Sequence, residues 1–511
     1  MVANMAPIMF AGLIVFLLIG FPVAFSLMAL GLFFGFIGIQ VGLFSSDYLS
    51  NLPLRVFGIV SNDLLLAIPF FTFMGTILER TGLAEDLLES AGQLFGGVPG
   101  GVAYAVILVG AIFGAISGTI AASVIALGMI ALPAMLRYGY HVKTATGVIA
   151  ATGTITQLVP PSLTLLVLAD QLGKPVGDMY AGAIGPSIAQ TLIFMLYILV
   201  LSVLRPRWVP PLPVEARTLR GWVLLKRVLW GVVPAMSLIF LVLGTIFLGL
   251  ATPTEAGAMG AVGALVLGAL RGRITRRLIW QGMDNTMRLS SMVIFILIGA
   301  TVFSLVFQGV DGPHWVEGLL GALPGGQVGF LIVVSLFIFV LAFFLDFFEI
   351  AFIVVPLLAP VAHKLGIDLI WFGVLLCVLL QTSFMHPPFG FALFYLRGIA
   401  PKAVKSRDIY WGALPWVGLQ LIMAAIVILW PELVTMWLSK EEKIDLDKVK
   451  IEIPIQEETT PPDASQFLQP GGQQEMAPQN PAGTDPGSAS GTQDPGTAPE
   501  RDTGRSSDAA K

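Results

Sequence analysis

Cysteine and charged residues are both scarce in this sequence of 511 residues. The single cysteine, Cys377, excludes an internal disulfide and any metal site that a cluster of cysteines would form. Charged residues make up 12% of the chain, against about 25% in an ordinary soluble domain, whereas hydrophobic residues make up 56%. This composition predicts an all-α polytopic membrane protein in a lipid bilayer, and it gives no reason to expect a nucleic-acid partner.

The sequence also lacks the motifs of common catalytic centres. It contains no GxxxxGK[ST] loop, which would cradle the phosphates of ATP, and neither an HExxH nor a GxSxG pattern. We therefore expect no enzymatic activity, no ATP hydrolysis and no cofactor.

Long apolar runs recur through most of the chain. At roughly 20 residues for each span, we count on the order of ten to twelve spanning or re-entrant segments. The run over 7–39 is interrupted by Gly20-Phe21-Pro22, so it forms either two short helices or one long kinked helix. A polar connection is predicted over 45–62, before a helix over 64–78.

Two apolar runs are each interrupted by a pair of prolines. Pro160 and Pro161 interrupt a run over 144–170, and the sequence Pro387-Pro388 interrupts a run over 368–397. Proline removes an N–H donor and clashes with the carbonyl one turn back, so each run is predicted to be two half-helices joined by irregular backbone. A simple kink would explain one such pair, whereas two pairs at matched spacing favour the binding site of a transporter.

The second half of the chain repeats landmarks of the first half. Small residues interrupt the run over 102–135, which predicts a re-entrant hairpin with its tip at 117–119. An offset of 227 residues places the tip of a second hairpin, over 328–362, at 344–346. The positions matched at offsets of 225 and then 227 residues are Gly96, Pro99, Gly100 and Gly101 with Gly321, Pro324, Gly325 and Gly326, and Pro133, Gly139, Pro160 and Pro161 with Pro360, Gly366, Pro387 and Pro388.

Basic residues indicate that the two repeats have opposite orientations. They concentrate at 137–143, 205–227, 271–277 and 397–407, which the positive-inside rule places on the cytoplasmic side. The first broken helix must then run outward and the second inward. The fold is therefore predicted to contain two inverted-topology repeats.

These patterns divide the chain into five predicted parts. The acidic tail, rich in proline and glycine, lacks the apolar residues of a core and is predicted to be disordered, either as an inert extension or as a tether for a partner. The parts are N-terminal scaffold helices over 1–62, a first inverted repeat over 63–204, a basic cytoplasmic linker over 205–230, a second inverted repeat with the last helix over 231–438, and the tail over 439–511.

Oxygen-bearing side chains near the breaks are the candidate ligands. Asp346 lies in a strongly apolar setting, where a carboxylate is costly and functional by default, unless the position is near the water interface. Neutral oxygens beside the proline pairs suit Na⁺, and the N-termini of half-helices suit an anionic substrate. The candidate substrate-binding residues are Thr154, Gln157, Ser162, Ser383, His386 and Arg397.

Three of the charged or titratable residues have competing explanations. Two roles fit Arg397, attraction of a substrate carboxylate or a cytoplasmic topology anchor, and the positive-inside pattern favours the anchor. His386 is suited to carrying a proton or to hydrogen bonding, and we favour hydrogen bonding. Glu255, in the sequence Thr-Pro-Thr-Glu, is expected to cap the helix that follows it.

At these residues the sequence resembles the large membrane subunit of tripartite ATP-independent periplasmic (TRAP) transporters, of the DctM type, within the ion-transporter superfamily. The resemblance covers about Pro7 to Leu438. Its most specific pieces are 67–75, the Ser117-Gly118-Thr119 tip, 132–135 with Gly139 and Tyr140, 159–162, 251–256 and 387–390.

The resemblance implies a Na⁺-driven importer subunit of the bacterial inner membrane, in which hairpins and broken helices slide against a scaffold as an elevator. It implies an organic acid anion as substrate, such as a C4-dicarboxylate or 2-oxo acid, and two partners, a small four-helix membrane subunit and a periplasmic solute-binding protein. The alternative is a stand-alone H⁺- or Na⁺-coupled carboxylate carrier or antiporter of the same superfamily. Carried onto this chain, the first cation site would comprise Ser117, Gly118, Thr119, Thr156 and Pro160, and the second Asp346, Thr382, Ser383 and Pro387.

Overall fold

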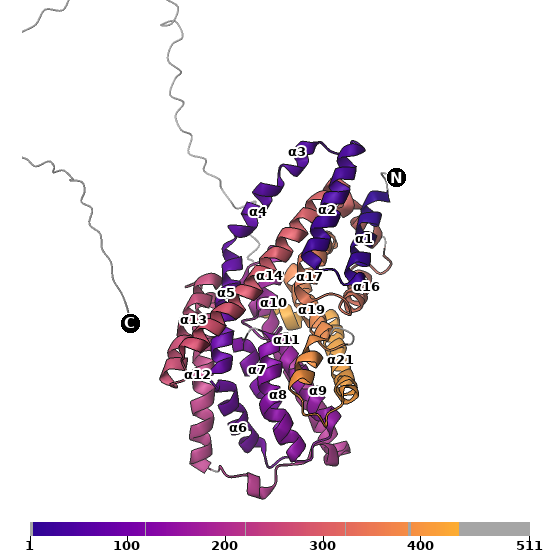
Figure 1. Ribbon diagram of the computed structural model, residues 1–511. Helices are drawn as coiled ribbons and strands as arrows, with labels where there is room; N and C mark the ends of the chain where they lie inside the picture. The colour runs from indigo at the N-terminus through magenta and orange to yellow at the C-terminus, as the bar shows by residue number, and fades with distance from the viewer. Residues whose placement is uncertain (1–3, 118, 220, 322, 387–389, 439–511) are drawn as a thin grey trace, which may run out of the picture. The chain divides into compact units, whose positions relative to one another are not determined.

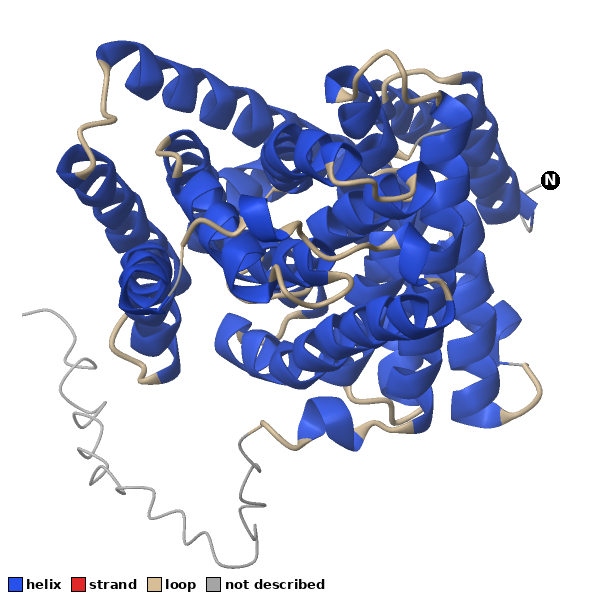
Figure 2. Ribbon diagram, turned by 90° about the horizontal axis from the view of Figure 1, so that it is seen from below, coloured by secondary structure: helices blue, strands red, loops and turns tan. Residues whose placement is uncertain are grey.

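The computed structural model describes residues 4–117, 119–219, 221–321, 323–386 and 390–438, and every regular element within them is helical (Figure 2). Eight of the described helices are long and apolar enough to cross a membrane, or up to ten spans result if two bent helix pairs are included. The all-α membrane architecture predicted from composition is therefore confirmed.

The helices fall into four groups along the chain. The first group is α1 (Met5–Ile19), α2 (Val23–Gln40), α3 (Ser46–Leu49), α4 (Leu52–Val60), α5 (Asp63–Arg80) and α6 (Leu83–Phe95). The second is α7 (Gly101–Ser117), α8 (Ile120–Arg137), α9 (Val142–Ile155), α10 (Leu163–Leu172) and α11 (Val176–Leu204). The third is η2 (Pro206–Trp208), η3 (Val214–Ala216), α12 (Gly221–Phe247), α13 (Pro253–Leu270) and α14 (Arg276–Gly309). The fourth is α15 (Gly312–Gly321), α16 (Gly326–Leu341), α17 (Phe347–Glu349), η4 (Ile350–Val354), α18 (Val355–Lys364), α19 (Leu369–Leu380), η5 (Gln381–Phe384), α20 (Phe391–Ile399), α21 (Ser406–Leu429) and α22 (Glu432–Thr435).

The start of the chain settles one alternative and corrects one expectation. The apolar run over 7–39 forms two helices, because Gly20 ends α1 with a left-handed φ of 90° and Pro22 precedes α2. The expectation of a polar connection over 45–62 is wrong, since α3 and α4 occupy most of it. Pro53 does not prevent this, because it lies in the first turn of α4, where a proline leaves no needed N–H unpaired.

A layer of long helices packs around α14. This helix of 34 residues contacts α2 and α5, and α5 in turn packs against α13 (Figure 1). Close packing there depends on small residues, since a Cβ added to Gly257 of α13 would lie 3.1 Å from the Cβ of Phe70. The start of α13 carries the predicted cap: Thr252 and Glu255 form a capping box, with the Thr252 amide donating to Glu255 Oε2 at 2.8 Å.

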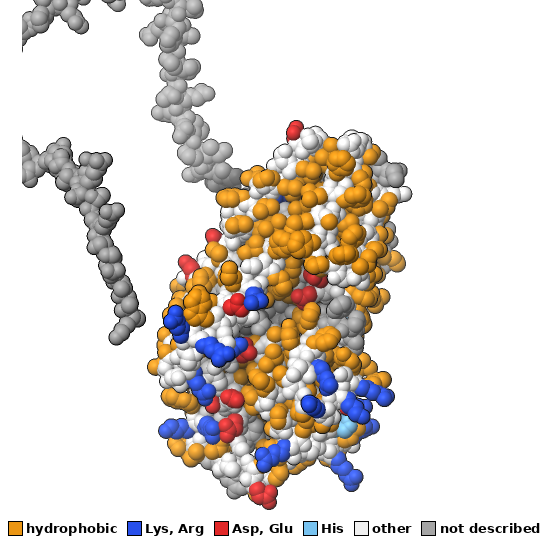
Figure 3. All heavy atoms as spheres, viewed as in Figure 1, with side chains coloured by type: hydrophobic (Ala, Val, Ile, Leu, Met, Phe, Trp, Pro, Cys, Tyr) orange, Lys and Arg blue, Asp and Glu red, His pale blue; other side chains and the backbone are white. Residues whose placement is uncertain are grey.

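The segment between the two repeats is shorter than predicted. The linker was expected over 205–230, but α12 begins at Gly221. Its chain is bound to the first repeat by two backbone hydrogen bonds, from Gly100 N–H to the Val209 carbonyl and from Leu212 N–H to the Gly96 carbonyl. On the face shown in Figure 3, lysine and arginine gather over the lower part, which carries α6 and the start of α12 in the matching view of Figure 1, as the positive-inside rule leads one to expect.

The helices α9 and α21 lie side by side and run parallel. A Cβ added to Gly147 of α9 would lie 2.2 Å from the carbonyl oxygen of Gly412, so the two backbones touch there. Two turns further along both helices, Gln420 Nε2 donates to Thr154 Oγ1 at 2.8 Å. Residue numbers therefore rise together along α9 and α21.

The second broken helix runs in the opposite direction. Trp371, at the start of α19, donates its Nε1–H to the carbonyl of Val427, near the end of α21, at 2.8 Å. The segment η5, which follows α19, still packs against α21 and α9. Only an antiparallel arrangement allows both contacts, so α19 opposes α21 and α9, as inverted repeats require.

Candidate functional site

The first broken helix interrupts its backbone between α9 and α10. Residues 156–162 are irregular there and include a cis peptide bond between Pro160 and Pro161. Ser162 starts the second half-helix as its N-cap, with its Oγ accepting from the backbone N–H groups of Thr164 at 3.1 Å and Leu165 at 3.4 Å. The same hydroxyl donates to the Gln157 carbonyl. Ser162 therefore serves the backbone of the break.

The second broken helix passes from α19 through η5 to α20. Thr382 and Ser383 are buried in η5, and their hydroxyls donate to the carbonyls of Leu379 and Leu380 at 2.6 and 2.7 Å. The predicted residue Pro387 lies outside the described residues, as does its neighbour Pro388. The interruption is nonetheless present, since α19 ends at Leu380 and α20 begins ten residues later.

Two helical hairpins approach the breaks. In the first, α7 ends at Ser117 and Thr119 is the N-cap of α8, whereas Gly118 and the Ser117 side chain lie outside the described part of the chain. In the second, α16 ends at Leu341 and Asp346 is the N-cap of α17. Glu349 fixes this turn, because its Oε2 accepts from the backbone N–H of Asp346 at 2.9 Å.

The hairpins and the broken helices enclose one cavity of about 250 Å³. The long helix α14 completes its wall. The cavity therefore lies where both repeats meet the helices around α14. Its lining residues are Thr119, Ile120 and Ala121 from the first hairpin, Gln157, Leu163 and Thr164 from the first broken helix, Asp346, Phe347 and Phe348 from the second hairpin, Phe384, Phe391 and Tyr395 from the second broken helix, and Leu289 and Met292 from α14.

Three of the predicted site residues line this cavity together: Thr119, Gln157 and Asp346. Asp346 Oδ1 and Gln157 Oε1 are both buried without a hydrogen-bond partner among the described residues. Burying such acceptors unpaired is costly, so a ligand or ion that supplies the missing interaction would stabilise the site. The arrangement suits a small cation at the carboxylate and a polar ligand at the amide.

The other predicted residues lie behind the cavity or away from it. Thr156 is buried and donates from its Oγ1 to Ser123 Oγ at 3.0 Å, against the first hairpin. Thr154 faces α21, since its Oγ1 accepts from Gln420. Arg397 is exposed on α20 and donates to the carbonyl of Val404, so the structure keeps it out of the cavity lining. Pro160 is buried within the first break.

The position of His386 was not foreseen from the sequence. Its ring stacks on Phe343 at 4.1 Å between centroids and meets Phe339 edge-on at 4.9 Å, and both of its nitrogens lack a partner among the residues described. His386 therefore lies beside the arm of the second hairpin. The favoured hydrogen-bonding role finds no described partner in this structure.

Sequence reasoning missed four residues of the cavity wall: Thr164, Phe384, Phe391 and Tyr395. Phe391 and Tyr395 are four residues apart on α20, and their rings stack with centroids 6.5 Å apart. An aromatic pair at one-turn spacing directly after a proline pair was a usable signal for this face. Thr164 follows the capping Ser162 by two residues, which by itself indicates nothing about its direction.

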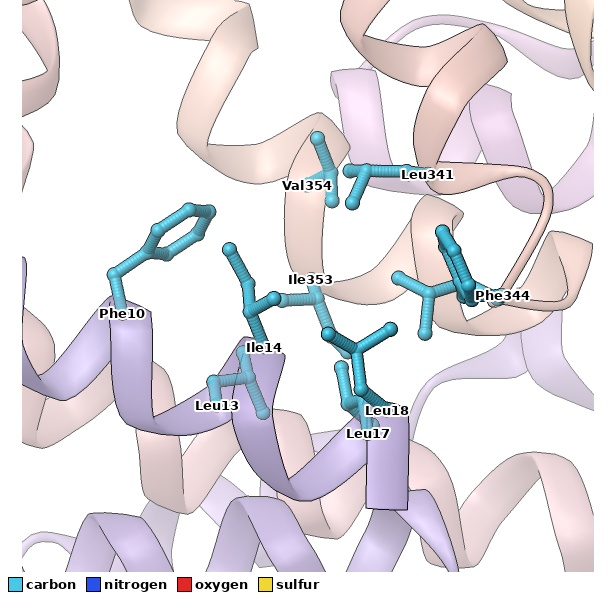
Figure 4. A pocket seen from close by; sticks show the side chains of 10 residues that line it. Phe10, Leu13, Ile14, Leu17, Leu18, Leu341, Phe344, Ile353 and Val354 are labelled. Carbon is cyan, nitrogen blue, oxygen red and sulfur yellow. The ribbon is translucent and has the colours of Figure 1, made fainter. Parts of the chain in front are cut away.

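A second, much smaller void lies between α1 and the second hairpin. It has a volume of about 30 Å³ and is lined wholly by apolar side chains, including Phe10, Leu13 and Leu17 from α1 and Phe344 and Ile353 from the hairpin (Figure 4). With no polar group among its lining residues, it offers nothing to hold a charged solute. It marks a dry contact between the hairpin and α1.

The fold and the cavity define a class: a polytopic transporter in which two inverted repeats bring their hairpins and broken helices to one site. A family model of the tripartite ATP-independent periplasmic transporter, DctM component, matches residues 10–433. The chain belongs to this family. The resemblance drawn from the sequence motifs is therefore confirmed.

Individual relatives agree with this assignment. The chain is 31% identical over 394 residues to the C4-dicarboxylate TRAP transporter large permease protein DctM of Pseudomonas aeruginosa, which covers 75% of this chain and 88% of that protein. It is 28% identical over 421 residues to the isethionate TRAP transporter permease protein DctMQ of Oleidesulfovibrio alaskensis, covering 82% of this chain and 64% of the relative. Among solved structures, the Alcanivorax borkumensis YdaH transporter matches with a TM-score of 0.58 at 16% identity, over 78% of this chain and 91% of that one, which supports the fold.

Proposed function

We propose that this chain is the transport subunit of a Na⁺-driven importer for a small organic acid anion in a bacterial inner membrane. The observation that carries the proposal is the cavity, which both repeats line and which holds two unpaired buried acceptors, Asp346 Oδ1 and Gln157 Oε1. One carboxylate among hydroxyl and amide oxygens is a ligand set that suits Na⁺.

The anionic substrate follows from the surroundings of the same cavity. The half-helix α10 begins at its wall, with Leu163 and Thr164 lining the cavity. The N-terminus of a helix favours a negative group, and a bound cation would add to that attraction. The names of the two relatives, for a C4-dicarboxylate and for isethionate, are those of transporters for small organic anions.

Transport requires the cavity to face each side of the membrane in turn. We propose that the hairpins and broken helices move as a unit along the helices around α14, in the manner of an elevator. The dry apolar contact between α1 and the second hairpin fits a sliding surface, because it contains no described polar pair that motion would break (Figure 4). A small four-helix membrane subunit and a periplasmic solute-binding protein are the proposed partners.

The test is uptake of radiolabelled organic acids into proteoliposomes that contain this chain, the small membrane subunit and the cognate binding protein. Uptake that requires both an inward Na⁺ gradient and the binding protein is the expected result. Uptake driven by a proton gradient alone, and indifferent to the binding protein, would instead support a stand-alone carrier. A panel of C4-dicarboxylates, 2-oxo acids and sulfonates, each with succinate as competitor, identifies the substrate class in the same assay.

A further inference from the structure

A cluster of buried glutamines lies behind the cavity, on the side away from the hairpin tips. We call Gln190, Gln381 and Gln420, together with Thr154, the amide cluster. All four side chains are completely buried, and none of them lines the cavity. The cation sites implied by the family resemblance include none of these four residues.

Contacts along α11 place Gln190 at the level of Thr154. Phe194 meets Trp416 edge-on at 4.9 Å, near the Gly147 end of α9, whereas Ser187 Oγ donates to the Leu158 carbonyl at 2.9 Å, beyond the other end of α9. Gln190 lies between Ser187 and Phe194 on the same helix. It is therefore level with Thr154, where Gln420 also makes its hydrogen bond.

Contacts along α19 bring Gln381 to the same level. The Cys377 thiol donates to the Gln157 carbonyl at 3.2 Å, and Gln381 follows Cys377 by about one turn in the direction opposite to α9. That step returns it to the level of Thr154. The packing of η5 against both α9 and α21 agrees with this position.

The four residues form two pairs related by the internal repeat. Thr154 and Gln381 are separated by the 227-residue offset that relates the proline pairs. Gln190 follows the first residue of α11 by fourteen positions, and Gln420 follows the first residue of α21 by fourteen positions. Each repeat thus contributes equivalent positions, and the cluster sits on the axis that relates the two halves.

Most polar atoms of the cluster lack partners. Both amide atoms of Gln190, both of Gln381, and Oε1 of Gln420 make no hydrogen bond to any described residue. Leaving a buried polar group unpaired costs roughly 1–3 kcal/mol, so a cluster of them at membrane depth requires something that pairs with them. A bound species within the cluster would meet this requirement.

The charge of the surroundings selects a cation. Both α9, which ends at Ile155, and α19, which ends at Leu380, direct their C-terminal ends to this level, and helix C-termini carry partial negative charge. Amide and hydroxyl oxygens of the cluster are ligands for a hard monovalent cation. Resting on the function proposed above, we infer that the amide cluster is an additional Na⁺ site, which couples a further ion to each transport cycle.

The experiment replaces Gln190 by Met, which keeps the volume and removes the amide, in the full chain assembled with its small subunit and binding protein. The control is Gln171→Met, which removes an amide from α10 that bonds to Asp170 and lies outside the cluster. The number of Na⁺ ions per solute is measured from the membrane potential at which net uptake reverses. We expect this ratio to fall by about one ion in Gln190→Met and to stay unchanged in the control.

A second measurement covers the case in which Gln190→Met does not fold. Gln190→Asn keeps an amide but withdraws it, and Na⁺ stabilisation of the purified chain against thermal unfolding, with choline as the reference cation, is compared with that of the wild type. A rise of about tenfold in the half-maximal Na⁺ concentration supports the site. An unchanged ion ratio and an unchanged Na⁺ response, with only a slower rate, would show that the cluster holds water and overturn the inference.

The two proposals fail in distinguishable ways. If the wild type shows no Na⁺-dependent uptake, the proposed function falls. The thermal measurement then still tests the cluster, since a Na⁺ response that the Asn variant weakens supports it and a response that both proteins share overturns it.

Discussion

The glycine at position 114 sets the distance between the first hairpin and the first broken helix. An ideal Cβ added to Gly114 would lie 2.9 Å from both the Cα and the Oγ1 of Thr156, and ordinary contact begins at about 3.4 Å. In Gly114→Ala, Thr156 must therefore retreat by about 0.5 Å, and it already donates to Ser123 Oγ at 3.0 Å. Overpacking of this kind costs about 1–3 kcal/mol.

The functional consequence concerns the cation. Thr156 is a proposed ligand of the first Na⁺ site, so we expect Gly114→Ala to raise the Na⁺ concentration for half-maximal uptake by about three- to tenfold, at saturating solute. The assay is Na⁺-dependent uptake in proteoliposomes, with thermal unfolding of the purified protein measured alongside.

The matched control is Gly418→Ala on α21, where an added Cβ would meet no atom within 4 Å. This control is expected to keep the wild-type Na⁺ response and to gain up to about 1 kcal/mol from helix propensity. If Gly114→Ala and Gly418→Ala behave alike in both measurements, the close contact with Thr156 does not matter and the reasoning fails.

Three further changes test other parts of the structure. Asp346→Asn should abolish Na⁺-coupled uptake while the protein stays monodisperse in size-exclusion chromatography; wild-type Na⁺ dependence would remove Asp346 from the site. Thr252→Ala removes the capping box with Glu255 and should cost about 0.5–2 kcal/mol in thermal unfolding, with solute affinity retained; equal stability would argue against the cap. Gly147→Ala places a Cβ 2.2 Å from the Gly412 carbonyl oxygen and should destabilise the protein by roughly 1–3 kcal/mol or more, visible as a lower unfolding temperature, whereas an unshifted midpoint would contradict the close crossing of α9 and α21.

Local chemistry made the interruptions of the helices predictable. A proline pair breaks a helix wherever it occurs, so the irregular segment around Pro160 followed from the residues alone. The capping role of Glu255 was predictable for the same reason, because a capping box involves only residues three apart. The short helices over 45–62 were missed because their polar residues resemble those of a loop, and nothing local shows that a helix will form there.

What the sequence by itself determined is the membrane class, the broken helices, the inverted repeat and the family. These follow from composition, from proline and glycine positions and from the distribution of basic residues, all of which act locally or through simple periodicity. Only the tertiary structure decided which side chains meet. Helices that are apolar all round do not reveal which face points inward, so the sequence could not show that Thr154 faces Gln420 while Gln157 and Asp346 face the cavity. Packing between segments more than 100 residues apart made that choice.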